Sequence, residues 1–213
     1  MNKVAVKNFT NTLLSITQNL ESDSGNMQQL IFEGLTYMPL LHGVDSAGFW
    51  LLNDDLNQFE CQASIHHQRI TQPNIRISSI HQPETYNLLI NNKETIIEPF
   101  IHNEPLNSLA HVLCHNVCLS SLLLLPLFVK GKNKGFIFLG NCKSKTLWKQ
   151  TAIFHTKILA QLFCRAILAI EHNKVTTRLH HQLQLMSEIE AISKTGGWEY
   201  DIASEKVFWT DET

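Results

Sequence analysis

The sequence has almost no excess charge of either sign. Across 213 residues, 17 Lys and Arg residues face 19 Asp and Glu residues, which gives a formal net charge of -2. Non-specific binding of nucleic acid requires a concentrated positive field. The one small basic cluster, Lys130, Lys132 and Lys134, falls in a predicted turn. We therefore expect no nucleic-acid partner.

The sequence also lacks the features of a membrane or secreted protein. Its longest apolar candidate, Cys118 to Val129, is interrupted by Ser120, Ser121 and Pro126 and is shorter than the roughly 20 residues of a membrane-spanning helix. The N-terminus shows no secretion signal, and five cysteines are an odd number without the density of a disulfide scaffold. These absences predict a cytoplasmic segment without membrane contact, and 44% hydrophobic residues predict a folded one.

Helix and strand patterns alternate along the chain. Apolar residues three and four apart predict a helix from about Ala5 to Leu20 and a second helix that ends at Pro39 or Gly43. Strand-like runs around turn residues predict two hairpins, Ala47–Leu52 with Gln58–Ala63 and Ser120–Val129 with Gly135–Gly140, the second turned by residues 130–134. Between the hairpins we predict four short elements: a strand at Ile75–Ile77, a helix at Pro83–Asn91, a strand at Thr95–Pro99 and a helix at Leu106–Asn116.

The stretch from Trp148 to about Ile192 contains neither Pro nor Gly, which permits one very long helix. Its first half is strongly apolar, whereas its second half thins to a narrow stripe of Val175, Leu179, Leu183, Met186 and Ile189. Such a stripe favours a coiled-coil seam, and a helix folded back on its own domain is the alternative. Beyond it, Trp198–Ile202 and Lys206–Trp209 predict two strands around a turn.

The second hairpin is the most telling part of this order. Ser121, the apolar run to Pro126 and Leu127, and the later Gly131 and Gly135 are similar to a hairpin pattern of GAF domains, and Ala47–Leu52 is similar to their early strand. Residues 13–170 therefore resemble a GAF domain, and with the N-terminal helix we assign residues 1–170 to a GAF-like sensory domain. The resemblance implies an α+β fold, with an antiparallel sheet flanked by helices and a long C-terminal helix. It also implies a parallel homodimer formed through the N-terminal and C-terminal helices.

A second resemblance covers the C-terminal stretch. Gly196-Gly197-Trp198-Glu199-Tyr200-Asp201 and Phe208-Trp209-Thr210-Asp211-Glu212 look like the opening of a PAS domain. We therefore interpret residues 193–213 as the start of a truncated PAS-like domain, joined by a helical connector at residues 171–192. GAF and PAS domains of this kind precede histidine kinases or cyclic di-GMP enzymes. The resemblance thus implies a sensory segment that is not itself an enzyme and relays a signal to an output domain downstream.

One cluster has the residue types of a metal site. His111, Cys114, His115 and Cys118 follow i, i+3, i+4 and i+7 spacing, and imidazoles and thiolates bind zinc. One helix rarely supplies four tetrahedral ligands, so we predict no metal and interpret these residues as lining a helix–sheet interface or a pocket. Cys114-His115 also lies in the wrong register for the bilin-binding pair of phytochrome-like GAF domains. The residues after Asn141 lack the signature of cyclic-nucleotide-binding ones.

By analogy with GAF domains, a ligand pocket lies between the sheet and Ile75–Asn116. Core packing is the competing role for Trp50 and Phe100. The sequence identifies neither a ligand nor a cofactor. The residues that we predict to bind a small molecule are Trp50, Tyr86, Phe100, His111 and His115.

Two alternatives to a ligand sensor remain at this point. One is a dimerisation or spacer domain with an empty pocket. The other is a thiol enzyme such as a free methionine sulfoxide reductase, which is disfavoured because Cys61, Cys142 and Cys164 have no sequence neighbours that would lower a thiol pKa. His66 and His67 are predicted in an exposed loop, and His180 and His181 on the solvent side of the long helix.

Overall fold

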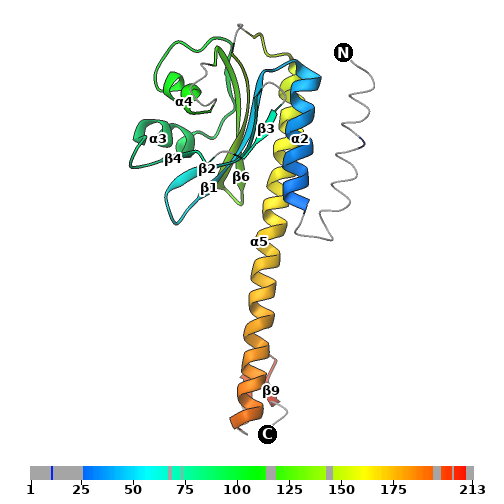
Figure 1. Cartoon of the computed structure of the whole chain (residues 1–213). Helices are drawn as coiled ribbons and strands as arrows, with labels where there is room; N and C mark the ends of the chain where they lie inside the picture. The colour runs from blue at the N-terminus through cyan, green and yellow to red at the C-terminus, as the bar shows by residue number, and fades with distance from the viewer. Residues whose placement is uncertain are drawn as a thin grey trace. The chain divides into compact units, whose positions relative to one another are not determined.

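The computed structural model describes residues 11, 26–66, 69–72, 74–113, 119–142, 146–193, 198–202 and 204–209. They belong to two units, Met1–Ala169 and Ile170–Thr213. The first contains an antiparallel sheet with helices on both faces (Figure 1). Apart from residue 11, the predicted helix Ala5–Leu20 lies outside the described residues.

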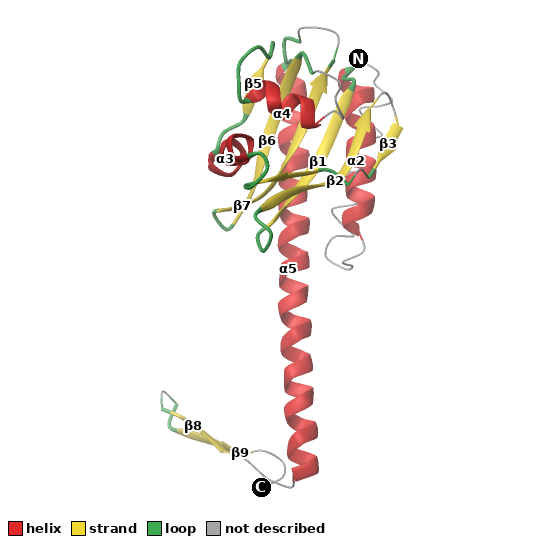
Figure 2. Ribbon diagram, turned by 60° about the vertical axis from the view of Figure 1, so that its left-hand side comes forward, coloured by secondary structure: helices red, strands yellow, loops and turns green. Residues whose placement is uncertain are grey.

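Seven strands form the sheet of the first unit in the order β3-β2-β1-β7-β6-β5, with β4 paired to β2 (Figure 2). Both predicted hairpins are confirmed, and β1 joins them by pairing with β7 from Ser46 opposite Gly140 to Leu51 opposite Gly135. The short strand β3 was not predicted. The strands are β1 Ser46–Asn53, β2 Gln58–His66, β3 Arg69–Thr71, β4 Arg76–Ser78, β5 Ile96–Glu98, β6 Ser121–Val129 and β7 Lys132–Asn141.

The turn between β6 and β7 is shorter than predicted. Lys130 and Gly131 form it alone, with φ of 51° and 77°, the positive values that a two-residue type I′ turn requires at both positions. Lys132 to Lys134 therefore belong to β7. The Asn133 side chain donates a hydrogen bond to the Leu89 carbonyl at 2.9 Å, which ties β7 to α3 (Pro83–Asn91).

Helix α2 (Asn26–His42) and the part of α5 (Gln150–Ser193) that belongs to the first unit lie side by side on one face of the sheet. The helix α2 runs through Pro39 and ends at His42, immediately before Gly43, whose amide donates a hydrogen bond to the Pro39 carbonyl at 2.8 Å. The two helices approach closely: a Cβ added at Gly34 would lie 2.7 Å from a methyl group of Leu159. With alternate residues of the sheet, such as Phe49, they form what we call the α5-face core.

Helices α3 and α4 (Leu106–Leu113) cover the opposite face and close a second core, the α3-face core. The predicted bounds of α3 are confirmed. For α4, the predicted residues 114–116 lie outside the described part of the chain. Both faces of the sheet are thus covered in the first unit, as the continuous burial of β7 from Gly135 to Asn141 requires.

The second unit contains the latter half of α5 and a hairpin of β8 (Trp198–Asp201) and β9 (Lys206–Trp209). The long helix and this hairpin are confirmed, and His180 and His181 are exposed as predicted. Contrary to the sequence-based expectation, Gln150–Ile189 is long and apolar enough by composition to cross a membrane. Leu159, Phe163 and Ala166 within it are buried in the α5-face core, which is the pattern of a core helix.

Candidate functional site

Four aromatic side chains form a continuous row on the α3 face of the sheet. Trp50 of β1 stacks on Phe136 of β7, with ring centroids 5.5 Å apart and planes 14° apart. The edge of Phe136 meets Phe59 of β2 at 5.4 Å, and Phe59 lies 5.6 Å from Tyr86 of α3. Alternation along each strand places these rings on one face. We call Trp50, Phe136, Phe59 and Tyr86 the aromatic row.

Trp50 has an unsatisfied donor inside the α3-face core. Its side chain is 0% exposed, and its indole Nε1 has no hydrogen-bond partner within the part of the chain that the structure describes. Leaving a buried donor unpaired costs about 1–3 kcal/mol, and such donors are rare in native proteins. The Trp50 N–H is therefore the group on this face that an acceptor from a ligand would satisfy.

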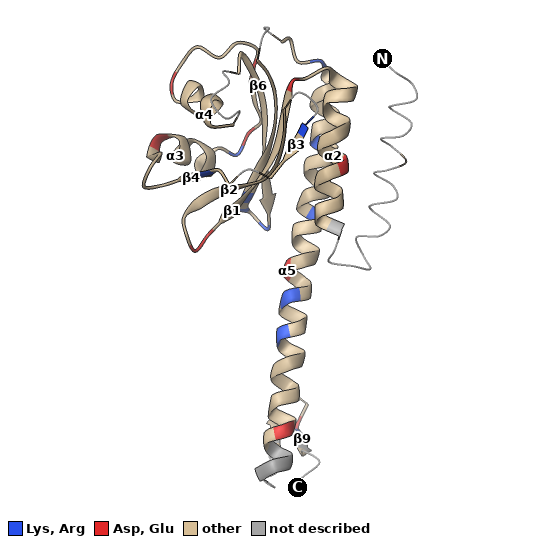
Figure 3. Cartoon of the chain, viewed as in Figure 1, with Lys and Arg blue, Asp and Glu red and all other residues tan. Residues whose placement is uncertain are grey.

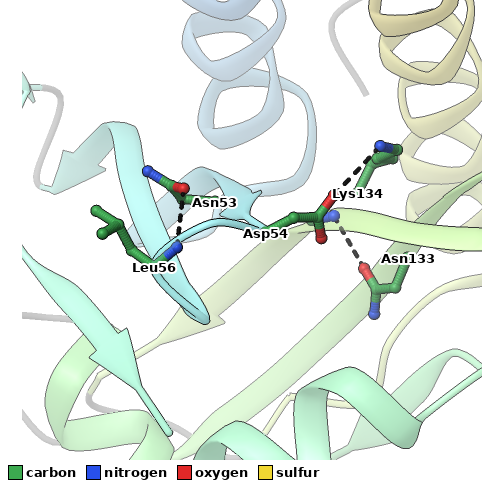
Figure 4. Close-up of polar contacts among 6 residues, drawn as sticks. Asn53, Asp54, Leu56, Asn133 and Lys134 are labelled. Atoms are coloured by element: carbon green, nitrogen blue, oxygen red, sulfur yellow. Dashed lines mark hydrogen bonds and ion pairs between the residues drawn. The ribbon is translucent and has the colours of Figure 1, made fainter.

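Tyr86 supplies a phenol at the other end of the row. Burial, and after it the negative charge of Asp54, raises the pKa of the Tyr86 phenol above its usual value. The phenol is thus neutral and can donate a hydrogen bond. Asp54, in the turn between β1 and β2, is held by an ion pair with Lys134 at 3.5 Å (Figure 4).

The other predicted ligand-binding residues do not join this row. Phe100 is 40% exposed and stacks on His102 at 5.5 Å. His111 is exposed on α4, because this helix turns Leu109, Ala110 and Leu113 toward the sheet. His115 lies outside the described residues. The structure therefore brings together Trp50 and Tyr86 of the predicted set, and their role in binding stays a prediction.

No model of a known family and no curated protein matches the sequence, but solved structures do match the fold. The GAF domain of a phosphoenolpyruvate-protein phosphotransferase from Acinetobacter has a TM-score of 0.57 and 15% identity, and the match covers 82% of this chain and 97% of that one. The chain has the GAF fold. The predicted α+β architecture is thereby confirmed.

Other proteins with the GAF fold differ in what they do. A free methionine-R-sulfoxide reductase from Neisseria meningitidis, solved with its substrate, matches with a TM-score of 0.56 and 14% identity over 81% of this chain and 95% of that one. The photosensory core of a Stigmatella aurantiaca phytochrome matches with a TM-score of 0.54 and 16% identity, over 81% of this chain and 39% of that one. At such identities the likeness concerns the fold alone.

A polar cluster at one end of this GAF sheet was not predicted. His66 was expected in a loop but ends β2, half-buried, and its Nδ1 lies 2.6 Å from the Ser46 hydroxyl. Ser46 lies one residue before the predicted strand Ala47–Leu52, and no sequence pattern indicated its pairing with His66. The Cys142 thiol lies 3.9 Å from the same hydroxyl.

The other described thiols of the first unit differ in burial, since Cys61 is buried and Cys164 is half-buried. Desolvation raises the pKa of Cys61 to about 12 and also raises the pKa of Cys164, so both are protonated at neutral pH and react slowly with electrophiles. Among the described residues, no group of three or more His, Cys, Asp and Glu side chains could hold a metal ion. Cys114, His115 and Cys118 lie outside those residues, so the absence of a metal stays a prediction.

Proposed function

We propose that this chain is the sensory part of a multidomain signal-transduction protein, in which a small ligand on the α3 face changes the packing of α5. The GAF fold, shared with a phytochrome photosensory core, supports a sensory role. The observation that carries the proposal is the unpaired indole N–H of Trp50 inside an otherwise apolar core. A ligand with an apolar or aromatic body and one acceptor atom complements this donor and the aromatic row.

The strand β1 offers a short physical route from this face to α5. Phe49 and Trp50 are adjacent, but Trp50 belongs to the α3-face core and Phe49 to the α5-face core. The register of β1 against β2 shifts between these two residues. On the far side, the Phe49 ring lies 4.2 Å from Phe163 of α5. A ligand that favours one packing of Trp50 would thus bias the position of α5, provided that it binds the two arrangements with different affinity.

The output is proposed to lie beyond the connector. In this proposal two copies pair in parallel through their N-terminal and C-terminal helices, and the exposed stripe on α5 forms the seam. The β8–β9 hairpin would open a PAS domain, with a histidine kinase or cyclic di-GMP enzyme downstream, in a soluble cytoplasmic protein. Exposed Trp198 and Trp209, paired across this hairpin, support a further layer of protein over it.

The proposal is tested by a thermal-shift screen of metabolites on the full chain and on the Trp50→Phe variant. The variant keeps an aromatic ring and removes the unpaired N–H. We expect at least one compound to stabilise the wild type and to bind the variant about tenfold more weakly or worse. Without ligand, removal of the unsatisfied donor stabilises the variant by about 1–3 kcal/mol and the cavity left by the smaller ring offsets this gain, so its stability should lie within about 2 kcal/mol of the wild type.

Trp198→Phe, on the exposed hairpin, is the matched control and should bind as the wild type does. A compound bound equally by the Trp50→Phe variant would show that the donor is not used. If no compound stabilises the chain, the spacer alternative replaces the sensor.

A thiol enzyme is the second candidate, favoured by the contact of Cys142 with the Ser46–His66 pair and by the likeness to the Neisseria reductase. We expect no reduction of free methionine sulfoxide, since burial keeps Cys61 and Cys164 protonated. Turnover in a thiol-coupled assay that disappears with Cys142→Ser would replace the non-enzymatic proposal.

A further inference from the structure

A groove lies between β6 and α5, away from the α3 face. Its cavity volume is about 520 Å³, and β6 lines it with Leu125, Pro126 and Phe128. The groove is open along the outer edge of β6, because β5 pairs only with Leu122, Leu123 and Leu124 of that strand. Beyond Leu124, no strand among those described pairs with the outer side of β6. The side facing α5 is lined by Lys157, Ala160, Gln161, Cys164 and Arg165.

This edge is unsuited to pairing with another strand. Pro126 has no amide hydrogen to donate, and the register of β6 against β7 shifts between Leu127 and Phe128. Proline and irregular register are the features by which edge strands avoid added strands. An occupant of the groove therefore contacts side chains, and its binding has to come from apolar burial and charge.

The charge in the groove is of one sign. One exposed row on α5 consists of Lys157, Gln161 and Arg165, which recur every four residues. The row lies beside the apolar residues that line the groove. Basic positions along α5 are blue in Figure 3. Within the described residues, neither Lys157 nor Arg165 forms an ion pair, while Lys134 does. The two uncompensated cations complement an anion, and the guanidinium of Arg165 suits a carboxylate in particular.

The size of the groove favours a small molecule over a protein. A volume of 520 Å³ falls in the range of small-molecule sites, which is about 300–1,000 Å³. The eight residues that line the groove are far fewer than the roughly 20–30 residues that a partner contributes to a stable protein interface. Lys157 and Arg165 are about 12 Å apart along the helix, the length of a medium acyl chain.

We infer that this groove binds an amphipathic carboxylate, whose alkyl chain covers the β6 side and Ala160 and whose carboxylate contacts Arg165 or Lys157. Such a ligand touches the sheet and α5 at once and therefore stabilises their contact. It would act on the same helix as a ligand on the α3 face but from a separate site. The inference does not depend on the Trp50 site.

Decanoate, a chain of about the required length, tests the inference by calorimetric titration of the full 213-residue chain below the concentration at which decanoate aggregates. We expect saturable binding, and binding of the neutral analogue decanol that is about tenfold weaker or worse. The Lys157→Gln, Arg165→Gln double variant, which keeps long polar side chains, should lose about tenfold or more in affinity for decanoate. Lys174→Gln, an exposed substitution on α5 outside the groove lining, should change nothing.

Cys164 reports where the ligand sits. It lines the groove and is half-buried, so decanoate should slow its alkylation by iodoacetamide, followed by peptide mass spectrometry, in the wild type. Trp50→Phe should leave decanoate binding intact, which separates this site from the one proposed on the α3 face. Any one of four results would overturn the inference. Two of them are the absence of saturable decanoate binding and binding of decanoate to the double variant as tightly as to the wild type. Decanol binding as tightly as decanoate, or decanoate binding without protecting Cys164, would overturn it equally.

Discussion

The imidazole side chains of His42 and His155 form a direct contact between α2 and α5. His42, the last residue of α2, has its Nε2 3.2 Å from the Nδ1 of His155 on α5, with ring centroids 5.1 Å apart. Burial first, then the charges of His155 and Lys149, lowers the pKa of His42 from 6.5 to about 4. Burial also lowers the pKa of His155. One hydrogen bond between two neutral rings holds the pair, and protonation of both would oppose it.

The pH dependence of stability follows from these lowered pKa values. Between pH 6.5 and pH 4, the unfolded chain binds a proton at His42 that the folded chain does not, so stability rises with pH in this window. The contribution of the His42–His155 pair to folding stability is fully present above pH 6.5 and is lost as the pH falls toward 4. We expect the urea midpoint to fall over this range, and less steeply in His42→Gln.

His81→Gln is the control for this prediction, because His81 is exposed and far along the chain from the pair. It should have the slope of the wild type. An equal slope in all three proteins would assign the acid sensitivity to other groups.

Helices and hairpins were the elements that local sequence patterns identified well. The runs behind β1, β2, β6 and β7, and the first turn of α3 at Pro83, are visible without tertiary context. The three-residue strand β3 was missed because its pairing with Ser64–His66 is set by the neighbouring strand rather than by its own sequence. Pro39 suggested a helix end that the packing of Met38 in the α5-face core overrides.

The contact between α2 and α5 is set by a single missing side chain. We expect Gly34→Ala to destabilise the protein by about 1–2 kcal/mol, because overpacking a fully buried Leu159 outweighs the roughly 1 kcal/mol gained from helix propensity. Gln28→Ala, at an exposed position of the same helix, has no packing cost and only a small gain in helix propensity, so it should be neutral or slightly stabilising. Urea denaturation measures both, and a stabilised Gly34→Ala variant would show that Leu159 moves aside at little cost.

At the scale of the whole molecule, the proposed dimer depends on an apolar stripe that nothing in the described part of the chain covers. Val175, Leu179, Leu183, Met186 and Ile189 of α5 are each between 56% and 69% exposed. Their spacing of three and four residues is that of a coiled-coil seam. The sequence predicted the stripe, but the aromatic row of the candidate site was only half predicted. Phe136 reaches Trp50 through the pairing of β1 with β7, which are far apart in sequence, and Phe59 joins the row through its contact with Phe136.

A substitution on the stripe tests the dimer. We expect the wild type to be a dimer by light scattering, and Leu183→Asp to weaken dimerisation by about 2 kcal/mol or more, because a carboxylate is placed in an apolar seam. Asn173→Asp adds the same charge at an exposed position on the side of α5 opposite the stripe and should leave the dimer intact. A monomeric wild type at high concentration, or dissociation by both substitutions, would contradict the seam.

The division of the first unit into two cores has an evolutionary consequence. The α3-face core and the α5-face core share the backbone of the sheet but no side chain. Substitutions on distant, separately packed groups act almost independently, whereas neighbours such as Phe49 and Trp50 stay coupled. Away from these two residues, the α3 face can therefore change its side chains while the α5 face keeps its packing. For the sensor proposed above, this means that a lineage could exchange what it detects and preserve the helix through which it reports.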